Sequence, residues 1–284
     1  MNIVCIIQAR TTSSRLPNKV LLDLPYGSGI TVLEQVINRV KKCKYVNNIV
    51  VATTDNETDD RIEILCKKIG ISCTRGSEDN VLSRYYKAAK ESKADMIVRI
   101  TSDCPCIDPE VIDNLVVKHL EEKNDYTSNS LKRSFPHGLD CEIFSFDLLE
   151  EANNNATEKF EKEHVTPYFY KTKKEKYKIG NLVLKNSEGY EKIRITLDSK
   201  EDYTLLCLVY DYLYNKEKEI FTCKDIVKLF LEKPWLFNIN NNIEQKKVCL
   251  NLDEEIEESL RILNKQDLNR AEKYLKEQYY GKDK

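Results

Sequence analysis

The chain has 284 residues, enough for one large domain with or without a smaller appendage. Hydrophobic residues make up 41% and charged residues 32%, which are the proportions of a globular protein. Lysine and arginine number 45 against 47 aspartates and glutamates, so the net charge of −2 provides no overall basic field for nucleic acid or an anionic membrane. No segment reaches the roughly 20 apolar residues of a membrane helix. The N-terminus turns polar too early for a signal peptide, so we expect a cytoplasmic protein.

The ten cysteines are scattered and lie mostly in apolar runs, which favours buried free thiols over a disulfide framework. Cys104 and Cys106 form the closest pair, but no CxxC pair accompanies them. The chain has only three histidines, so the spacing and the supply of ligands both disfavour a zinc site.

The first half of the chain alternates short β-branched runs with amphipathic stretches. We expect strands at 3–7, 49–53, 71–74 and 96–101, and helices at 31–43, 58–69, 79–92 and 108–122. The last helix has Asp108 as its N-cap and Pro109 in its first turn. Repeated βα units predict an α/β fold with a doubly wound, mainly parallel sheet. Such sheets bind ligands beyond the carboxyl ends of their strands.

The alternation weakens between about 125 and 190, which we expect to form an inserted arm. This part contains a short apolar stretch at 141–146, two helical stretches within 146–172 and a strand-like 177–184. A further strand is expected at 193–197, ending at Asp198, with helices near 200–214 and 223–232. The tail at 252–280 is charged and amphipathic. We therefore expect a main domain at 1–235, and a linker and C-terminal helical appendage at 236–284.

A cationic loop follows the first strand at residues 8–19. It combines Arg10, Arg15 and Lys19 with four hydroxyl side chains. Such a loop can wrap a triphosphate, because amides and hydroxyls bond phosphate oxygens while fixed cations neutralise them. It contains neither the P-loop pattern nor G-x-G-x-x-G. The alternative is a solvated polar loop, although short βα loops are seldom this long or this cationic.

Two aspartates follow two of the expected strands. Asp103 comes after 96–101 and Asp198 after 193–197. Two carboxylates from different strand ends suit Mg²⁺, which fills its octahedron with water and phosphate oxygens. Each aspartate alone is equally consistent with a helix N-cap. Only the combination with the cationic loop favours a metal that offsets phosphate charge during in-line attack on an α-phosphorus.

Seven ordered motifs carry a family resemblance: IIQARTTSSRLPNKVL, IVVATTD, RGSEDNVLSRYYKAA, VRITSDCPCIDP, HGLDCEIFSF, EKEHVTPYFY and ITLDSKEDY. They resemble the SpsF-like cytidylyltransferases associated with spore coat polysaccharide biosynthesis. Those proteins are similar to the synthetases of CMP-sialate and CMP-3-deoxy-manno-octulosonate. The resemblance covers about residues 1–235. It implies a Rossmann-like, GT-A-like nucleotidyltransferase fold and Mg²⁺-dependent transfer of CMP from CTP to a small acceptor, releasing pyrophosphate.

The resemblance also implies roles for individual positions. The metal ligands would be Asp103 and Asp198, and the catalytic residues would be Arg10, Arg15, Lys19 and Asp103. The residues that contact CTP, through its phosphates, base or ribose, would be Gln8, Ala9, Arg10, Ser14, Arg15, Lys19, Thr53, Thr54, Ser77, Arg84 and Thr101. One departure is Thr11-Thr12, where relatives often have Met-Gly or a similar pair, and this difference could change the loop geometry.

Acceptor choice and homodimer formation are expected from the region 125–190. His164 is similar to a histidine that touches the sugar acid in the octulosonate enzymes, and a surface or capping histidine is the alternative. Asp140 and Glu142 would share one face of an extended segment and could hold a hydroxyl, an amine or a second metal. The alternative for them is an exposed strand face. His137 lies beside them. The acceptor stays open: a sugar acid, a sugar phosphate or another phosphorylated metabolite would fit.

Two other functions stay open. A nucleotide-sugar-dependent glycosyltransferase would use the same scaffold, but such enzymes commonly carry D-x-D, and Asp103 is followed by Cys104 and Pro105. A non-catalytic nucleotide-binding protein could recruit partners through residues 252–280, although it would not need the full set of loop cations and aspartates. We therefore expect a cytidylyltransferase that serves surface polysaccharide or glycoconjugate biosynthesis.

Overall fold

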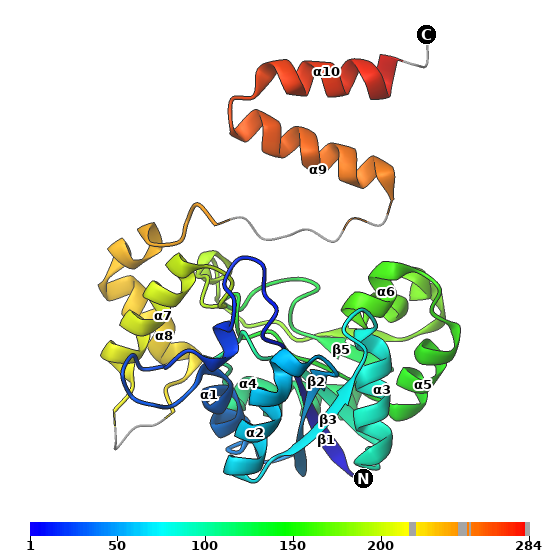
Figure 1. The fold of residues 1–284 in the computed structure, drawn as a ribbon, viewed down its shortest axis with the longest axis vertical. Helices are drawn as coiled ribbons and strands as arrows, with labels where there is room; N and C mark the ends of the chain where they lie inside the picture. Colours follow the sequence, from blue (N-terminus) through cyan, green and yellow to red (C-terminus); the bar gives the residue numbers. More distant parts are fainter. Residues whose placement is uncertain (216–219, 244–248, 250, 282–284) are drawn as a thin grey trace. The chain divides into compact units, whose positions relative to one another are not determined.

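The computed structural model describes residues 1–215, 220–243, 249 and 251–281. Helices cover both faces of one sheet (Figure 1). The strands are β1 (Ile3–Gln8), β2 (Asn48–Thr54), β3 (Ser72–Gly76), β4 (Met96–Thr101), β5 (Tyr126–Ser128), β6 (Glu142–Ser145) and β7 (Ile179–Asn181). The helices are α1 (Val32–Val40), α2 (Asp60–Ile69), α3 (Val81–Glu91), α4 (Pro109–Glu122), α5 (Phe146–Asn155), α6 (Lys159–His164), α7 (Lys200–Leu213), α8 (Cys223–Glu232), α9 (Leu252–Lys265) and α10 (Asn269–Tyr280).

The sheet has the strand order β3-β2-β1-β4-β6-β5-β7. Strands β1 to β4 run parallel, β6 is antiparallel to both β4 and β5, and β5 is parallel to β7. The expected α/β fold with a mainly parallel sheet is confirmed. Gln8 at the end of β1 pairs with Thr101 at the end of β4 and with Ala52 of β2. The loops after these three strands therefore begin at the same edge of the sheet.

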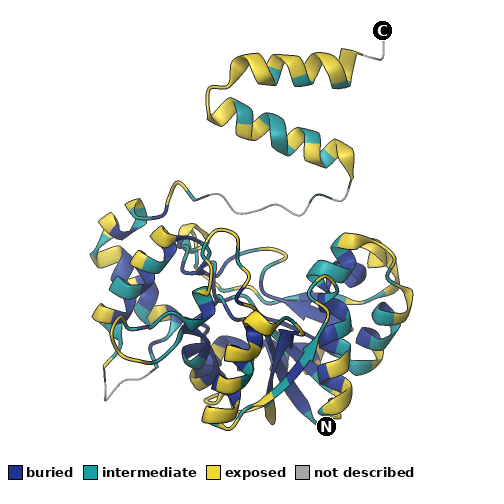
Figure 2. Ribbon diagram, viewed as in Figure 1, coloured by how far each residue is buried: buried dark blue, intermediate teal, exposed yellow. Residues whose placement is uncertain are grey.

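The central strand β1 is buried on both faces, as its unbroken apolar run predicts. Ile3, Cys5 and Ile7 pack in one core with residues of α1, α2, α4, α7 and α8. Val4 and Ile6 pack in a second core with α3, α5 and aromatic residues of the arm. Figure 2 shows the central strands of the sheet buried between the helical layers. β1 is therefore packed on both faces up to Ile7, close to the start of the polar loop.

The start of α4 confirms the predicted cap. The Asp108 side chain accepts from the Glu110 amide at 2.9 Å, and Pro109 is the first helical residue. The other Asp108 oxygen accepts from the Cys223 amide at 2.6 Å. One carboxylate therefore caps α4 and ties it to the start of α8.

A buried arginine fixes the same region from α1. The Arg39 Nε donates to the carbonyl of Ile107 at 2.7 Å, and its Nη2 donates to the carbonyls of Cys106 and Phe221. Because these carbonyls would otherwise be buried without a partner, the arginine stabilises the loop that follows β4. That loop contains Asp103.

The expected strand at 193–197 is wrong, because this segment joins no sheet. It forms an isolated bridge in which Arg194 pairs with His137, and the Leu197 amide donates to the Asp103 carbonyl at 2.8 Å. Gly138 permits the close approach: its φ is +114°, and a Cβ there would lie 2.6 Å from the carbonyl carbon of Ile195. Backbone groups of this segment hydrogen-bond to the loops that contain Asp103 and His137, so the segment needs no neighbouring strand.

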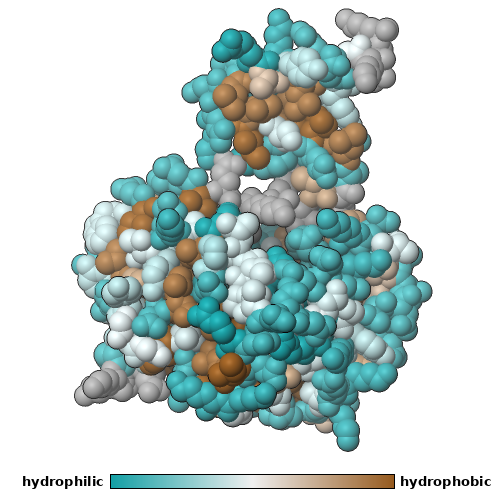
Figure 3. All heavy atoms as spheres, in the orientation of Figure 1, coloured by the Kyte–Doolittle hydropathy of each residue, from teal (hydrophilic) through white to brown (hydrophobic). Residues whose placement is uncertain are grey.

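The contacts divide the chain into two compact units, Met1–Ile243 and Glu244–Lys284. Residues 236–243, which we expected to begin a linker, belong to the first unit, where Leu236 and Asn240 are buried. In the second unit α9 and α10 pack on each other, and no residue of either helix is buried. Apolar side chains gather on the hairpin surface (Figure 3). Within the described residues no helix is long and apolar enough to cross a membrane.

Candidate active site

The cationic loop after β1 is folded back on itself. The Thr11 carbonyl accepts from the amides of Ser13 and Asn18, both at 2.9 Å. The Thr11 amide and hydroxyl both donate to one oxygen of Asp59, at 2.7 and 2.6 Å. Asn18 then takes a left-handed conformation, with a φ of 58°, and opens the short helix that carries Lys19. These bonds set the direction in which the loop presents its cations.

Lys19 lies between the two aspartates. Its Nζ is 3.1 Å from Asp103 Oδ2 and 2.9 Å from Asp198 Oδ1, and it donates to the Leu197 carbonyl at 2.7 Å. Burial alone would lower the pKa of Lys19, but the two carboxylates raise it above its ordinary value. The ammonium is therefore charged and held by three oxygens. The structure thus brings together three residues separated by up to 179 positions in the sequence.

The Asp103 carboxylate is held in its charged form. Burial alone would raise its pKa, but the Lys19 charge and the hydroxyl of Thr101, which donates at 2.5 Å, lower the pKa to about 2. The Asp103 backbone is fixed as well, because its carbonyl accepts from the Thr196 hydroxyl at 3.1 Å. A carboxylate that stays ionised and immobile is suited to binding a cation.

Asp198 is the second carboxylate, and its two oxygens have different partners. Oδ1 faces Lys19 and lies 3.3 Å from Arg15 Nη2. Oδ2 accepts from Arg194 Nη2 at 3.1 Å. Oδ1 is therefore the oxygen that contacts two cations of the loop.

The donor set fits a magnesium ion. The site already holds a cation, since the Lys19 ammonium is bound by one oxygen of each aspartate. In the described part of the chain no cluster of three or more His, Cys, Asp and Glu could hold a metal. A divalent ion bound by Asp103 and Asp198 would therefore draw its other ligands from water and phosphate, as Mg²⁺ does.

On the other side of the loop, Glu78 gathers three donors. Its carboxylate lies 3.2 Å from Arg10 Nη1, and it accepts from the Thr12 hydroxyl at 2.6 Å and the Asn56 amide at 2.5 Å. These bonds lower the pKa of Glu78. Arg10 is thus held over the β3–α3 loop by an acidic side chain, in the manner in which a phosphate could hold it.

The residues expected near the base and ribose lie at the ends of β1 and β2, in the β3–α3 loop and in α3. Two of them carry buried polar atoms without a hydrogen-bond partner among the described residues, Thr53 Oγ1 and Arg84 Nε. Arg84 also donates to the Ser77 carbonyl at 2.8 Å, and burial lowers its pKa. Since unpaired buried polar groups are costly, these two atoms are candidates for contacts with a ligand.

The remaining positions implied for CTP have these surroundings. Gln8 accepts from Arg99 Nη2 at 3.0 Å. Ala9 is buried, and its amide donates to the Ala52 carbonyl. The Thr54 hydroxyl donates to Asp59, and Ser14 is exposed on the loop.

The acceptor candidates separate into two environments. Asp140 forms a bidentate ion pair with Arg133, at 2.5 and 2.8 Å, and lies 3.7 Å from His137 Nε2. The other ring nitrogen of His137 is 3.3 Å from Arg194. Burial lowers the pKa of His137. These groups connect to the Asp198 carboxylate through Arg194.

Glu142 has different partners. It pairs with Arg99 and accepts from the hydroxyls of Tyr126 and Thr166. Glu142 is buried, so the alternative of an exposed strand face is wrong for this residue. His164 is the half-buried last residue of α6, two positions before Thr166.

Four of the residues that organise this site were not singled out from the sequence: Asp59, Glu78, Arg133 and Arg194. Asp59 and Glu78 act through partners that are distant in the sequence. Arg133 and Arg194 pair with aspartates whose positions only the fold shows. The charge of Arg194 inside the apolar IRITL run was the one available signal.

A mainly parallel sheet with this strand order, a cationic loop after β1 and a pair of aspartates beside it are the features expected of an α/β nucleotidyltransferase. A family model described as cytidylyltransferase matches residues 4–266. The chain belongs to the cytidylyltransferase family, and the resemblance found in its motifs is confirmed.

Three relatives support this membership. An uncharacterised protein of Methanocaldococcus jannaschii is 39% identical over 246 residues, 87% of this chain and 97% of the relative. The spore coat polysaccharide biosynthesis protein SpsF of Bacillus subtilis is 36% identical over 214 residues, 74% of this chain and 86% of that one. A solved cytidylyltransferase from Leptospira borgpetersenii serovar Hardjo-bovis has a TM-score of 0.77 and 33% identity, covering 88% of this chain and 100% of its own.

Replacing Lys19 with methionine removes the ammonium and keeps a side chain of similar length. We expect the pKa of Asp103 to rise from about 2, because the raising effect of burial would no longer be offset by this charge. Carbon NMR of the aspartate carboxyl groups against pH, with Asp103→Asn to assign the signal, measures the shift. Lys67→Met, in an exposed part of α2, is the control and should leave the titration unchanged. The same Asp103 pKa in Lys19→Met and wild type would contradict the ion pair.

Proposed function

We propose that this cytidylyltransferase transfers CMP from CTP to a small acceptor in a Mg²⁺-dependent reaction and releases pyrophosphate. The observation that carries the proposal is the cation site made by Asp103 and Asp198, with a lysine of the phosphate loop inside it. The loop cations and the metal ion suit a triphosphate, because together they neutralise its negative charge.

The loop residues bind the triphosphate. Arg10, Arg15 and Lys19 supply charge, and Ser14 and the loop amides supply hydrogen bonds. Arg10 and Lys19 both have carboxylate partners in the structure. When CTP binds, a phosphate therefore takes the place of a carboxylate beside each of these cations. The metal, when bound to Asp103 and Asp198, offsets the charge on the phosphate oxygens.

The base and ribose contact Gln8, Ala9, Thr53, Thr54, Ser77 and Arg84, and Thr101 is a further residue that binds the nucleotide. The unpaired Thr53 Oγ1 and Arg84 Nε support this assignment, because a cytosine offers the carbonyl and ring nitrogen acceptors that such groups lack. A nucleotide whose base leaves these two atoms unpaired binds with lower affinity, because nothing compensates for their burial.

The reaction needs no covalent enzyme intermediate. An acceptor oxygen forms a bond to the α-phosphorus, the α–β phosphoanhydride bond breaks, and pyrophosphate leaves with the electron pair. A hydroxyl acceptor gives up its proton to water in the same exchange. The protein contributes position and charge stabilisation, which supply most of the catalysis in phosphoryl transfer.

The acceptor binds beside the aspartate pair, where His137 and Asp140 lie, with His164 and Glu142 as more distant contributors. The cations of Arg133 and Arg194 line this side. Their charge suits a sugar acid, a sugar phosphate or another phosphorylated metabolite. A role in surface polysaccharide or glycoconjugate biosynthesis is supported by the similarity to SpsF.

The direct test is pyrophosphate release from purified protein with Mg²⁺, each of CTP, UTP, ATP and GTP, and pools of sugar acids, sugar phosphates and phosphorylated metabolites. We expect release with CTP and one acceptor class, and its loss in EDTA. Asp103→Asn and Arg15→Ala should each lower kcat/KM about 10²- to 10³-fold, because each removes transition-state stabilisation. Asp211→Asn and Arg270→Ala, at exposed positions on α7 and α10, are the controls.

Release that persists within a few-fold in Asp103→Asn or Arg15→Ala would show that these roles are wrong. Absence of release from every pair, with CTP still bound in the same buffer, would favour a nucleotide-binding protein.

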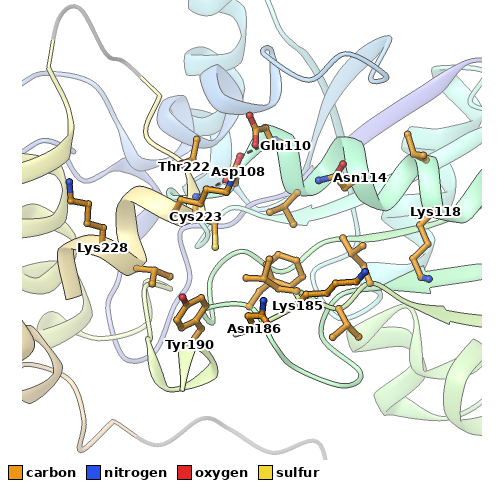
Figure 4. Close-up of a pocket in the computed structure, with 18 of the residues that line it drawn as sticks. Asp108, Glu110, Asn114, Lys118, Lys185, Asn186, Tyr190, Thr222, Cys223 and Lys228 are labelled. Atoms are coloured by element: carbon orange, nitrogen blue, oxygen red, sulfur yellow. Dashed lines mark hydrogen bonds between the residues drawn. The ribbon is translucent and has the colours of Figure 1, made fainter. Parts of the chain in front are cut away.

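We further propose a homodimer formed through the region 125–190. A groove of about 900 Å³ lies between α4, α8 and the segment 182–190 (Figure 4). Its lining includes the apolar Val111, Phe135 and Val227, and no residue assigned to the CTP site lines it. A second copy of the chain is its occupant in this proposal, because the exposed Val183 comes from the region in which related enzymes are expected to dimerise.

Val183→Glu and Leu231→Glu place a charge on this groove, where the two side chains are 48% and 71% exposed. We expect either substitution to convert a dimer to a monomer in light scattering coupled to size exclusion, since a buried unpaired charge opposes association. Ile64→Glu, at a 64% exposed position on α2, should leave the dimer intact. A dimer that survives both groove substitutions, or a wild-type monomer at micromolar concentration, would contradict this interface.

A further inference from the structure

A buried hydrogen-bond network stands behind Asp198, on the side away from Lys19. Its centre is Asp202, whose side chain is 0% exposed and lies in the first turn of α7. Arg194 approaches it with two parallel bonds, Nε to Oδ1 and Nη2 to Oδ2, both 2.9 Å. The same Nη2 reaches Asp198 Oδ2 at 3.1 Å. The guanidinium therefore connects the buried aspartate to the candidate metal ligand.

Asp202 also fixes the backbone of Asp198. Its Oδ2 accepts from the amides of Asp198 and Ser199, at 3.0 and 3.2 Å. The Ser199 hydroxyl accepts from the Asp202 amide in return, which completes a capping box at the start of α7. Both the main chain and the side chain of Asp198 are thus set by Asp202, directly or through Arg194.

The last member of the network comes from Asn240, in the segment that follows α8. One amide nitrogen, Nδ2, donates to Asp202 Oδ1 at 2.8 Å and to the Arg194 carbonyl at 3.0 Å. Asn240 is 5% exposed, so water competes little for these bonds. It touches the two residues that hold Asp198, yet it is separated from Asp202 by 38 positions and lies outside the resemblance seen in the sequence.

We propose that Asn240 is a positioning residue for the metal site, acting on Asp198 through Asp202 and Arg194. The proposal rests on the function proposed above, in which Asp198 binds the divalent ion. With Arg194 holding Oδ2, the other oxygen faces the Lys19 ammonium, which also contacts Asp103. Residues behind a metal ligand set its orientation, and their loss typically lowers metal affinity 10- to 100-fold.

The test compares Asn240→Ala with wild type in two measurements. We expect the Mg²⁺ concentration for half-maximal activity to rise about 10-fold, with a smaller change in kcat at saturating Mg²⁺. We expect the affinity for Mn²⁺ in the presence of CTP without acceptor, measured from the EPR signal of free Mn²⁺, to fall by a similar factor.

Asn240→Asp sharpens the test, because it keeps the shape but replaces the donor with a carboxylate facing Asp202. Its metal affinity should be lower than that of Asn240→Ala, whereas a role in filling space alone predicts the reverse order. Asn124→Ala is the matched control: Asn124 is 8% exposed and its Nδ2 also donates twice, to Glu122 and Thr127. We expect it to lower thermal stability without changing the metal dependence.

Two failures are distinguishable. If Asp198→Asn retains wild-type Mn²⁺ affinity and activity, the proposed metal role is wrong. If Asp198→Asn abolishes both and Asn240→Ala differs from Asn124→Ala in neither Mg²⁺ dependence nor Mn²⁺ affinity, the positioning role of Asn240 is wrong while the proposed function stands.

Discussion

The contact between Lys19 and the paired carboxylates of Asp103 and Asp198 is the interaction on which the site depends. The Lys19 ammonium contacts one oxygen of each aspartate, and without a cation between them the two carboxylates would repel each other. The lysine supplies that cation from the loop that also carries Arg10 and Arg15. The site therefore has a compensated arrangement of charge without a nucleotide, and the groups that compensate each other are those to which the proposed function assigns the triphosphate and the metal ion.

Much of the remaining structure fixes these three side chains. The sheet brings the ends of β1 and β4 into register, which sets Lys19 near Asp103. Asp198 arrives differently, on an extended segment that rests on Gly138 and on the Asp103 backbone. The bonds of Arg39 and Asp108 hold the loop after β4 from the opposite side. Conformational freedom is thus removed from the aspartates by contacts outside the site, which is how a preorganised charge arrangement is maintained.

The sequence predicted the elements with strong periodicity and the loops that follow them. The strands from β1 to β4 and the helices from α1 to α4 were predicted with small differences at their ends. Their β-branched and amphipathic runs alternate regularly, and this alternation is typical of βα units in a parallel sheet. The strand expected at 193–197 was wrong for a physical reason. Its apolar pattern reports burial, and an extended segment bonded to two loops is buried as fully as a strand in a sheet.

The side-chain partners were beyond the reach of the sequence. Nothing in the pattern around Glu142 distinguishes an exposed strand face from a buried ion pair with Arg99, since the partner lies on β4. Asn240 similarly lies in an Asn-rich stretch typical of a linker, and only the packing of residues 236–243 shows that it is buried. Motifs therefore identified the family, while the side chains that orient the candidate metal ligands could be found only from the fold.

The most direct test of this account is a crystal structure of the protein with CTP and Mn²⁺, with the metal located by anomalous scattering. We predict a metal ion bound by carboxylate oxygens of both Asp103 and Asp198, with the Lys19 ammonium transferred to a phosphate oxygen of CTP. A metal bound by phosphates alone, with Lys19 still between the two aspartates, would contradict the account.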